Sequence, residues 1–327
     1  MKIVNLLFFL IILLSAYSQE HKLKWYTLKE AIELNKTKPK KFLIDMYTDW
    51  CVWCKKMDAE TFNHPGIAAF IQEYFYPVKF NAETKDTIEF KGKKYTNPNI
   101  GFRSTHSLAL ELMNNKPSYP TIVYLDEELK PISAVPGYMS PADIEPILVF
   151  FARNFYKLYP FEDFKNDFFK AFRDTSHFVD KIHWQSFDKG LKTKKKKIIF
   201  MYFEGCIDCI ILKKVIFQHD TISNYLNKYF TIIPFDVLTT DTIYFNNIEY
   251  INEKKEHPFH QLAVALTNAN ITLPGMVFLD ENNQLISYVP GFFPLKPFEM
   301  LIHFFNEEAY KNQTWENYTK SFKSKIP

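Results

Sequence analysis

Glycine is scarce in this chain, with only 8 among 327 residues, and none of them forms a glycine-rich run. Loops that cradle phosphate groups need several closely spaced glycines, because their backbone must approach the ligand. The sequence therefore offers no motif for a nucleotide cofactor, and we expect the protein to need no cofactor.

An excess of charge of one sign is also missing. Lysine and arginine together number 40 and aspartate and glutamate 37, which gives a formal net charge of +3. The chain has no basic stripe interleaved with aromatic residues, as a nucleic-acid-binding surface would have, so we exclude nucleic acid as a partner. Residues 192–197, KTKKKK, form the one dense basic run. We interpret this run as a solvated loop before a strand.

Long apolar runs are confined to the N-terminus, where residues 3–14 are almost wholly apolar and follow Lys2. Small residues at Ala16 and Ser18 complete the pattern of a secretory signal peptide, with cleavage expected between Ser18 and Gln19. The run is shorter than the ~20 residues of a membrane-spanning helix, so retention as an anchor is the less favoured alternative. No cysteine follows it, as one would in a lipoprotein. We therefore expect secretion across the inner membrane, into the periplasm or another extracytoplasmic compartment.

Cysteine is rare as well: all four cysteines lie in two Cys-x-x-Cys pairs, Cys51/Cys54 and Cys206/Cys209. A secreted protein usually uses its cysteines for long-range disulfides, and this chain has none left for that purpose. A four-cysteine zinc site normally brings its two pairs within a few tens of residues. These pairs lie 155 residues apart. The pattern predicts local dithiol chemistry and no metal site.

Internal repetition is the most prominent feature that the sequence does contain. A shift of 155 residues aligns the second half of the chain with the first, and a shift of 154 does so after one residue is lost. The matched pairs include Met46 and Met201, Phe62 and Phe217, His64 and His219, Phe80 and Phe235, His106 and His260, and Pro120 and Pro274. Such matches indicate a duplicated domain and not a solenoid, whose repeats are far shorter. We predict a signal peptide at residues 1–18, a first domain at 19–173 and a second domain at 174–327.

Hydrophobic periodicity within the first copy alternates between strand-like and helix-like. Strands are expected at residues 41–47, 76–81, 121–125 and 131–135, with a small hairpin at 87–96. Helices are expected at residues 25–35, 51–75 with a break at His64-Pro65, 104–113 with Ser104 as cap, and 141–155. Residues 161–181, between the copies, are charged and aromatic, which favours a helix over a flexible linker.

Residues 42–57, FLIDMYTDWCVWCKKM, place a Cys-x-x-Cys pair directly after an expected strand. Cys51 would lie at the first turn of a helix, where free backbone N–H groups and the helix dipole favour a thiolate. Cys54 is one turn further on the same face and can attack a mixed disulfide formed at Cys51. The segment therefore has the order of residues that dithiol exchange needs.

This strand followed by a Cys-x-x-Cys helix resembles the thioredoxin family, most closely its envelope members with a Trp-Cys-x-x-Cys-Lys motif. The resemblance implies an α/β fold of two thioredoxin-like domains. Each would be a central mixed sheet flanked by helices, with an inserted hairpin before a cis-proline loop. Asp45 matches the buried acid that exchanges protons with the second cysteine of thioredoxins, here Cys54. An acid within an apolar strand is costly to bury, which favours a chemical role.

Ser118-Tyr119-Pro120-Thr121 resembles the cis-proline loop, which in that fold faces the dithiol and offers backbone groups to a substrate peptide. Leu273-Pro274 is its counterpart in the second copy. The resemblance thus implies a substrate-binding set made of Trp50, Val52, Trp53, Tyr119, Pro120, Leu273 and Pro274.

The second copy departs from the pattern at several positions. Phe200 replaces the acid, Gly205 replaces the tryptophan before the first cysteine, and Asp208 lies between the cysteines, where its charge disfavours a thiolate. We interpret Cys206/Cys209 as a degenerate site, and both a redox-capable pair and a stable disulfide stay open. His106 and His260 are interpreted as capping or core residues more than as substrate-handling residues.

The favoured function is an extracytoplasmic thiol–disulfide oxidoreductase that exchanges disulfides with protein substrates through Cys51 and Cys54, with reduction preferred. Its partners would be proteins with thiols or disulfides, and a redox partner in the membrane or envelope. One alternative is a disulfide isomerase with the second domain as a substrate-binding module. An alternative of another class is a non-catalytic binding or chaperone module whose disulfides are structural.

Overall fold

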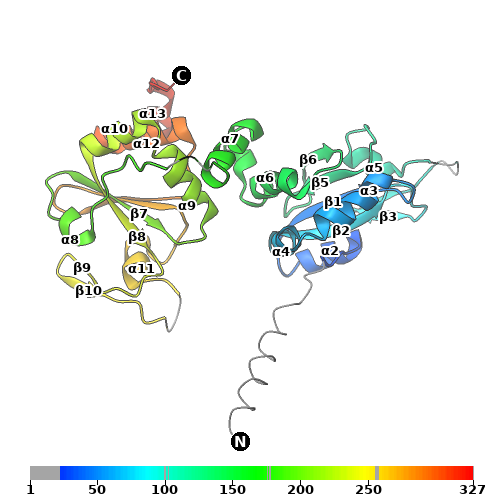
Figure 1. The fold of residues 1–327 in the computed structure, drawn as a ribbon, viewed down its shortest axis with the longest axis horizontal. Helices are drawn as coiled ribbons and strands as arrows, with labels where there is room; N and C mark the ends of the chain where they lie inside the picture. Colours follow the sequence, from blue (N-terminus) through cyan, green and yellow to red (C-terminus); the bar gives the residue numbers. More distant parts are fainter. Residues whose placement is uncertain are drawn as a thin grey trace, which may run out of the picture. The chain divides into compact units, whose positions relative to one another are not determined.

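The computed structural model describes residues 23–98, 101, 103–174, 176, 178–254 and 258–326 (Figure 1). The predicted signal peptide therefore lies outside the described residues. The chain divides into two compact units between Lys157 and Leu158, here called the first and second units.

The first unit is built on a four-stranded mixed sheet. Its strands are β1 (Lys41–Tyr47), β2 (Phe75–Asn81), β5 (Thr121–Leu125) and β6 (Pro131–Pro136), in the order β2-β1-β5-β6. β1 pairs parallel with β2 and antiparallel with β5. A separate hairpin of β3 (Ile88–Phe90) and β4 (Lys93–Tyr95) precedes β5, as predicted.

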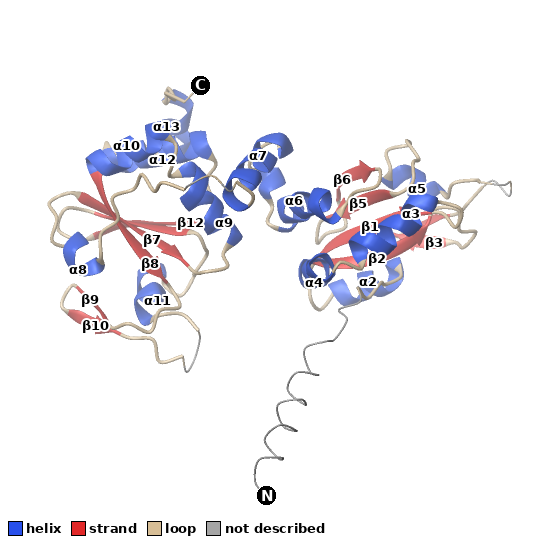
Figure 2. Ribbon diagram, in the orientation of Figure 1, coloured by secondary structure: helices blue, strands red, loops and turns tan. Residues whose placement is uncertain are grey.

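Helices cover both faces of this sheet (Figure 2). They are α2 (Leu28–Asn35), α3 (Val52–Met57), α4 (Pro65–Tyr74), α5 (Ser107–Leu112) and α6 (Pro141–Ala152), with a π-helical stretch at Asp58–Phe62 and a 3-10 turn at Phe155–Lys157. α2 and α5 share one apolar core with Phe42, Ile44 and Met46 of β1. Successive strand residues point to opposite faces, so Asp45 points away from that core.

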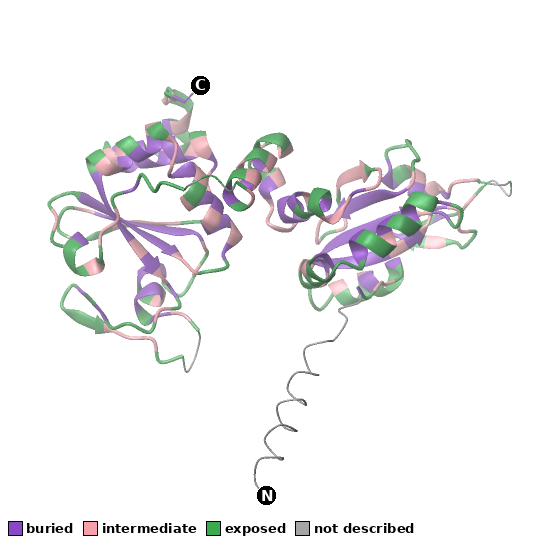
Figure 3. Cartoon of the chain, in the orientation of Figure 1, coloured by how far each residue is buried: buried purple, intermediate pink, exposed green. Residues whose placement is uncertain are grey.

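The second unit repeats this architecture. Its strands β7 (Lys196–Tyr202), β8 (Phe230–Asp236), β11 (Gly275–Leu279) and β12 (Leu285–Pro290) lie in the order β12-β11-β7-β8, again with one parallel pair. Its hairpin is formed by β9 (Ile243–Phe245) and β10 (Ile248–Tyr250). Its helices are α7 (Phe161–Phe172), α8 (Phe187–Gly190), α9 (Ile207–Ile211), α10 (Asp220–Tyr229), α11 (Gln261–Thr267), α12 (Leu295–Asn306) and α13 (Trp315–Ser321). Two more short helical stretches lie at Leu212–Ile216 and Ala309–Lys311. The predicted fold class is therefore confirmed for both copies, and the central strands of both sheets are buried (Figure 3).

Two histidines begin equivalent helices in the two units. The Nδ1 atom of His106 accepts the backbone N–H of Leu108 at 3.2 Å, and its Nε2 atom donates to the carbonyl of Asp86 at 3.1 Å. His260 makes the same pair of hydrogen bonds at the start of α11. Burial lowers the pKa of both histidines, which keeps the rings neutral and able to accept. The predicted capping role is confirmed, while Ser104 is wrong as the cap because α5 begins only at Ser107.

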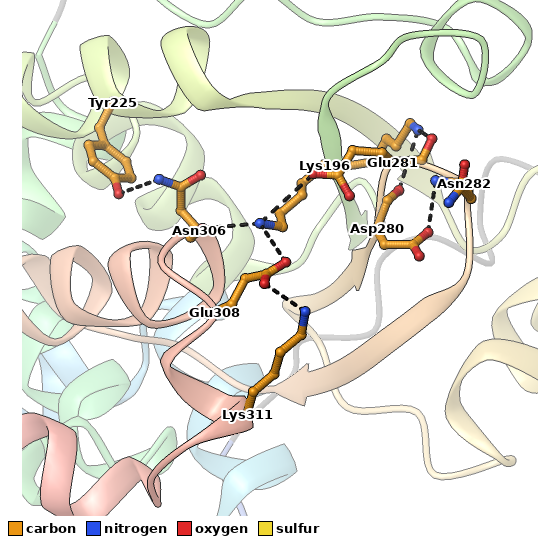
Figure 4. Close-up of polar contacts among 9 residues, drawn as sticks. Lys196, Tyr225, Asp280, Glu281, Asn282, Asn306, Glu308 and Lys311 are labelled. Carbon is orange, nitrogen blue, oxygen red and sulfur yellow. Dashed lines mark hydrogen bonds and ion pairs between the residues drawn. The ribbon is translucent and has the colours of Figure 1, made fainter.

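The basic run before β7 is only partly solvated. Lys196 and Lys197 are the first two residues of β7 and both are buried, so the interpretation as a solvated loop is wrong for them. The Lys197 ammonium donates to the carbonyl of Glu281 at 2.8 Å, and that of Lys196 donates to the carbonyl of Asn306 at 3.0 Å and pairs with Glu308 at 3.2 Å (Figure 4). Long lysine stems can lie in an apolar layer while their ammonium groups reach polar atoms at its edge.

Replacing Lys196 by alanine should lower the free energy of unfolding by about 2 kcal/mol, because hydrogen bonds to charged groups are worth about 1.5–3 kcal/mol each. Urea-induced unfolding of the full chain would measure this. Lys320→Ala is the matched control, because Lys320 forms an exposed pair with Glu316 on α13 and should cost less than about 0.5 kcal/mol. Equal losses for the two variants would contradict the structural role of Lys196.

Candidate active site

The first Cys-x-x-Cys pair lies just beyond the carboxyl end of β1. Cys51 is the N-cap of α3, and its Sγ accepts the backbone N–H of Cys54 at 3.1 Å. The two cysteines are joined by a disulfide with their Cα atoms 5.3 Å apart. A backbone N–H aimed at this sulfur also favours its thiolate once the bond is reduced.

The loop before β5 lies at the same end of the sheet as the dithiol. The peptide bond between Tyr119 and Pro120 is cis, as predicted. The register of β1 and β5 pairs Met46 with Thr121, so this loop opens at the end of β1 from which Cys51 follows. The ring of Tyr119 also meets that of Trp50 edge-on, with centroids 6.1 Å apart.

An exposed aromatic rim surrounds the dithiol. The side chains of Val52 and Trp53 between the cysteines are 75% and 55% exposed, and Trp50 is also exposed. Large apolar side chains left in solvent around a reactive group are typical of a surface that binds another protein. The predicted rim residues of the first copy are therefore brought together around one site.

Tyr138 is a member of this rim that the sequence interpretation missed. Its ring lies 5.5 Å from that of Trp53, and the Lys56 ammonium lies 5.2 Å from both centroids. Its hydroxyl donates to Glu60 at 2.6 Å. The signal was present, because an aromatic residue follows the repeated Pro-Gly pair in both copies, as Tyr138 and Phe292.

An ionic cluster centred on the buried Asp45 links β1, β2 and the helical run that begins at Cys51. Asp45 is only 1% exposed, and its Oδ2 accepts a hydrogen bond from the Lys79 ammonium at 2.5 Å. Lys79 lies directly opposite Asp45 on β2 and also pairs with Asp58, which follows α3. The rings of Trp25 and Tyr47 lie 4.7 and 5.0 Å from the same ammonium group.

This environment raises the pKa of Asp45 toward neutral pH. Burial raises the pKa of Asp45 to about 6, and the opposing charge and hydrogen bond of Lys79 only partly offset that effect. Burial alone would lower the pKa of Lys79, but its interactions with Asp45 and Asp58 outweigh burial and raise it. Oδ1 of Asp45 is buried with no hydrogen-bond partner in the described part of the chain. A carboxyl group with such a pKa can both take up and release a proton near neutral pH.

The sequence interpretation missed Lys79 and Asp58 as well. The repeat offers a signal, because Pro234 stands in place of Lys79 and Lys213 in place of Asp58 in the copy where Phe200 replaces Asp45. All three ionic residues of the cluster are thus replaced together.

The second Cys-x-x-Cys pair keeps the backbone geometry of the first but lacks its ionic cluster. The Sγ of Cys206 accepts the backbone N–H of Cys209 at 3.2 Å, and the two form a disulfide with Cα atoms 5.2 Å apart. The peptide bond between Leu273 and Pro274 is cis. Phe200 packs against Phe217 where the first unit has its ion pairs. The second site therefore has a dithiol and a proline loop but no buried acid at the position of Asp45.

Two further features of the described residues concern metal binding and membrane crossing. Among the described residues, no three histidine, cysteine, aspartate or glutamate side chains gather as metal ligands do. In the same part of the chain, no helix combines the length and apolarity that crossing a bilayer requires.

A cysteine pair that closes to a disulfide at the start of a helix is the working part of a thiol–disulfide oxidoreductase. The family model described as a thioredoxin-like domain matches the chain twice, at residues 28–152 and 185–306. The chain therefore belongs to the thioredoxin-like family, with one domain in each half and a Cys-x-x-Cys pair in each domain.

Solved structures resemble parts of the chain. A thioredoxin from Thermus thermophilus is 18% identical with a TM-score of 0.30, and the match covers 39% of this chain and 85% of that one. An oxidoreductase named DsbH is 20% identical with a TM-score of 0.29, and covers 39% and 83%. The oxidised C-terminal domain of DsbD from Neisseria meningitidis is 18% identical with a TM-score of 0.26, and covers 41% and 97%. No curated protein sequence matches the chain.

Replacing Asp45 by asparagine should change how stability depends on pH. A carboxyl group whose pKa is raised in the folded state binds more protons there than in the unfolded chain, so it lowers stability as the pH rises from about 4 to 6. The wild-type free energy of unfolding should therefore fall, relative to that of Asp45→Asn, by on the order of 2 kcal/mol across this window.

Urea-induced unfolding at pH 4 and pH 7 would measure this difference. The control Glu89→Gln removes an exposed carboxylate on β3 and should give the wild-type pH dependence. If the free energies of unfolding of the wild-type protein and of Asp45→Asn change equally between pH 4 and pH 7, Asp45 does not titrate in this window.

Proposed function

We propose that the protein is an extracytoplasmic oxidoreductase that reduces disulfides of protein substrates through Cys51 and Cys54. The observation that carries the proposal is a buried acid, Asp45, in the strand that leads to a dithiol whose first sulfur accepts a backbone N–H. The second unit has the dithiol without the acid, so the first unit is the catalytic one.

The reaction begins with both cysteines reduced. The Cys51 thiolate attacks one sulfur of the substrate disulfide, the substrate S–S bond breaks, and the leaving sulfur takes up a proton. The Cys54 thiol then gives its proton to Asp45 and attacks the Cys51 sulfur of the mixed disulfide. The bond between Cys51 and the substrate breaks, and the second substrate sulfur takes up the proton that Asp45 accepted, so the substrate leaves with two thiols. Two electrons have passed to it from the enzyme, which now holds the Cys51–Cys54 disulfide. A dithiol partner in the membrane or envelope must restore the reduced state.

The rim around the dithiol supports a protein as substrate. Trp50, Val52 and Trp53 offer apolar contact area beside the reactive sulfur. The backbone of Tyr119, next to the cis bond, would pair with an extended substrate segment as an added strand. A small-molecule disulfide would use little of this surface.

Two parts of the proposal, the reducing direction and the location outside the cytoplasm, rest on sequence features. The combination of Asp45 and Trp50 resembles reducing members of the family, and the N-terminal residues have the pattern of a secretory signal. The four cysteines are all used in the two local pairs, which fits a protein that carries out disulfide chemistry on others.

A Cys54→Ser variant should accumulate mixed disulfides with proteins of its own compartment, because the resolving thiol is missing and the bond at Cys51 persists. Non-reducing gels followed by mass spectrometry of the captured proteins would detect them. Cys209→Ser is the matched control at the equivalent position and should capture few or none. A Cys51→Ser variant that still reduces insulin would show that the nucleophile is assigned wrongly.

The direction of the reaction follows from the redox potential of Cys51–Cys54. We expect a value near that of thioredoxin, about −270 mV, whereas a value of about −120 to −180 mV would indicate an oxidase or isomerase. Titration with redox buffers, alkylation and mass spectrometry of each pair would give both potentials. A Cys51–Cys54 pair that stays oxidised below about −300 mV would be a structural disulfide, and the binding-module alternative would take its place.

A further inference from the structure

The outer faces of the two Cys-x-x-Cys helices differ in exposure. In α3, Trp53 is 55% exposed and Lys56 also reaches solvent. Their counterparts in α9 are Asp208, which is 7% exposed, and Ile211, which is fully buried. The two helices hold the same place in their repeats, so the difference comes from what lies on α9.

Residues 158–172 of the second unit lie on that face. α7, which makes up most of this segment, packs against α9 and against the helical stretch that follows it, as Figure 1 also shows. The ammonium of Lys214, in that stretch, donates to the carbonyl of Ala171 in α7 at 3.1 Å. Residues 158–172 thus contact the helix that carries the second dithiol, along with its continuation.

Tyr159 holds the start of this segment at the rim of the second site. Its ring stacks on that of Phe292, with centroids 6.1 Å apart and planes 19° apart. Phe292 is the repeat counterpart of Tyr138, and Asp208 is the counterpart of Trp53. Burial, together with the charges of Asp167, Asp208 and Asp163, raises the pKa of Tyr159. In the first unit Trp53 is exposed beside Tyr138, whereas here Tyr159 stacks on Phe292 and both Phe292 and Asp208 are buried.

We infer that residues 158–172 are a built-in cover that withholds the Cys206–Cys209 disulfide from protein partners and leaves it open to small thiols. The inference goes beyond the function proposed for the first site. Cys206 is 4% exposed, the same as Cys51, so the two residues are equally exposed. The difference lies in the surrounding surface, which a protein needs for docking and a small thiol does not.

The cover meets the rest of the unit along a partly open seam. A cavity of about 630 Å³ lies between α7, the stretch after α9 and the start of α12. Its lining includes Asp163, Asp167 and Lys170 of α7, facing Lys214 and His219. A seam with so many charged groups is not a continuous apolar core, so changing one contact at its edge should open the rim without unfolding the unit.

The test compares a protein reductant with a small one on the full-length oxidised chain. Reduced thioredoxin and dithiothreitol would each be mixed with the protein, and alkylation with mass spectrometry would follow each pair separately. Dithiothreitol should reduce both pairs at rates within about tenfold, while thioredoxin should reduce Cys206–Cys209 at least about 100-fold more slowly than Cys51–Cys54. The readout does not depend on turnover at the first site, so a failure here is distinct from a failure of the proposed function.

Variants of the cover separate shielding from slow chemistry. Tyr159→Ala should raise the thioredoxin rate at Cys206–Cys209 by about tenfold or more and leave the dithiothreitol rate unchanged. Tyr159→Phe keeps the stacked ring and should behave as the wild type. Lys214→Ala loosens α7 at another point and should act in the same direction, which keeps the test available if Tyr159→Ala does not fold.

Three results would overturn the inference. In the first, thioredoxin reduces both wild-type pairs equally fast. In the second, Tyr159→Ala and Lys214→Ala leave the thioredoxin rate at Cys206–Cys209 unchanged or raise both reductants' rates by the same factor. In the third, dithiothreitol fails to reduce Cys206–Cys209, because the pair would then be closed to small thiols as well.

Discussion

The pairing of the central strand with its two neighbours places the cis-proline loop and the Asp45–Lys79 pair of the first site. The antiparallel ladder between β1 and β5 sets Met46 opposite Thr121, which brings the cis-proline loop to the end of β1 where Cys51 follows. The parallel ladder between β1 and β2 sets Asp45 opposite Lys79. Because side chains alternate between the faces of a strand, a shift of one residue in either ladder would turn Asp45 into the core of α2 and α5.

The second unit shows that the fold does not need the ionic cluster. Its ladders have the same form, with Phe200 opposite Met276 on one side and Pro234 on the other, and the sheet is equally buried. Removing charged groups from water costs free energy that their attraction does not always return, and an apolar replacement is often neutral or stabilising. A buried acid kept in one copy and replaced by phenylalanine in the other therefore argues for a chemical role of Asp45.

Local patterns in the sequence were sufficient for much of this picture. The Cys-x-x-Cys pairs, the cis-proline loops and the strand at residues 41–47 all follow from short segments and from the repeat, and the structure has them where they were predicted. Groups that meet across elements were missed, because Lys79, Asp58 and Tyr138 reach the site only through strand register and loop path.

Burial was also difficult to predict at the edges of elements. The KTKKKK run was expected in solvent, yet the strand begins within it and takes its last two lysines into the sheet. Four lysines in succession have no apolar signal, and burial of the last two is tolerated because their ammonium groups reach the carbonyls of Asn306 at the end of α12 and Glu281 after β11.

The repeat provides a direct comparison for the cover on the second site, because α7 has a counterpart in the other copy. α7 and α13 hold the same place in their copies, since Phe164 aligns with Tyr318 and Phe168 with Phe322. α13 packs on α12, where the rings of Tyr318 and Phe304 lie 5.2 Å apart. α7 lies on α9, beside the second dithiol. The same kind of amphipathic helix thus lies away from the dithiol helix in one case and on it in the other. A single duplication can in this way give one dithiol open to proteins and another that is shielded from them, without any change to the cysteines themselves.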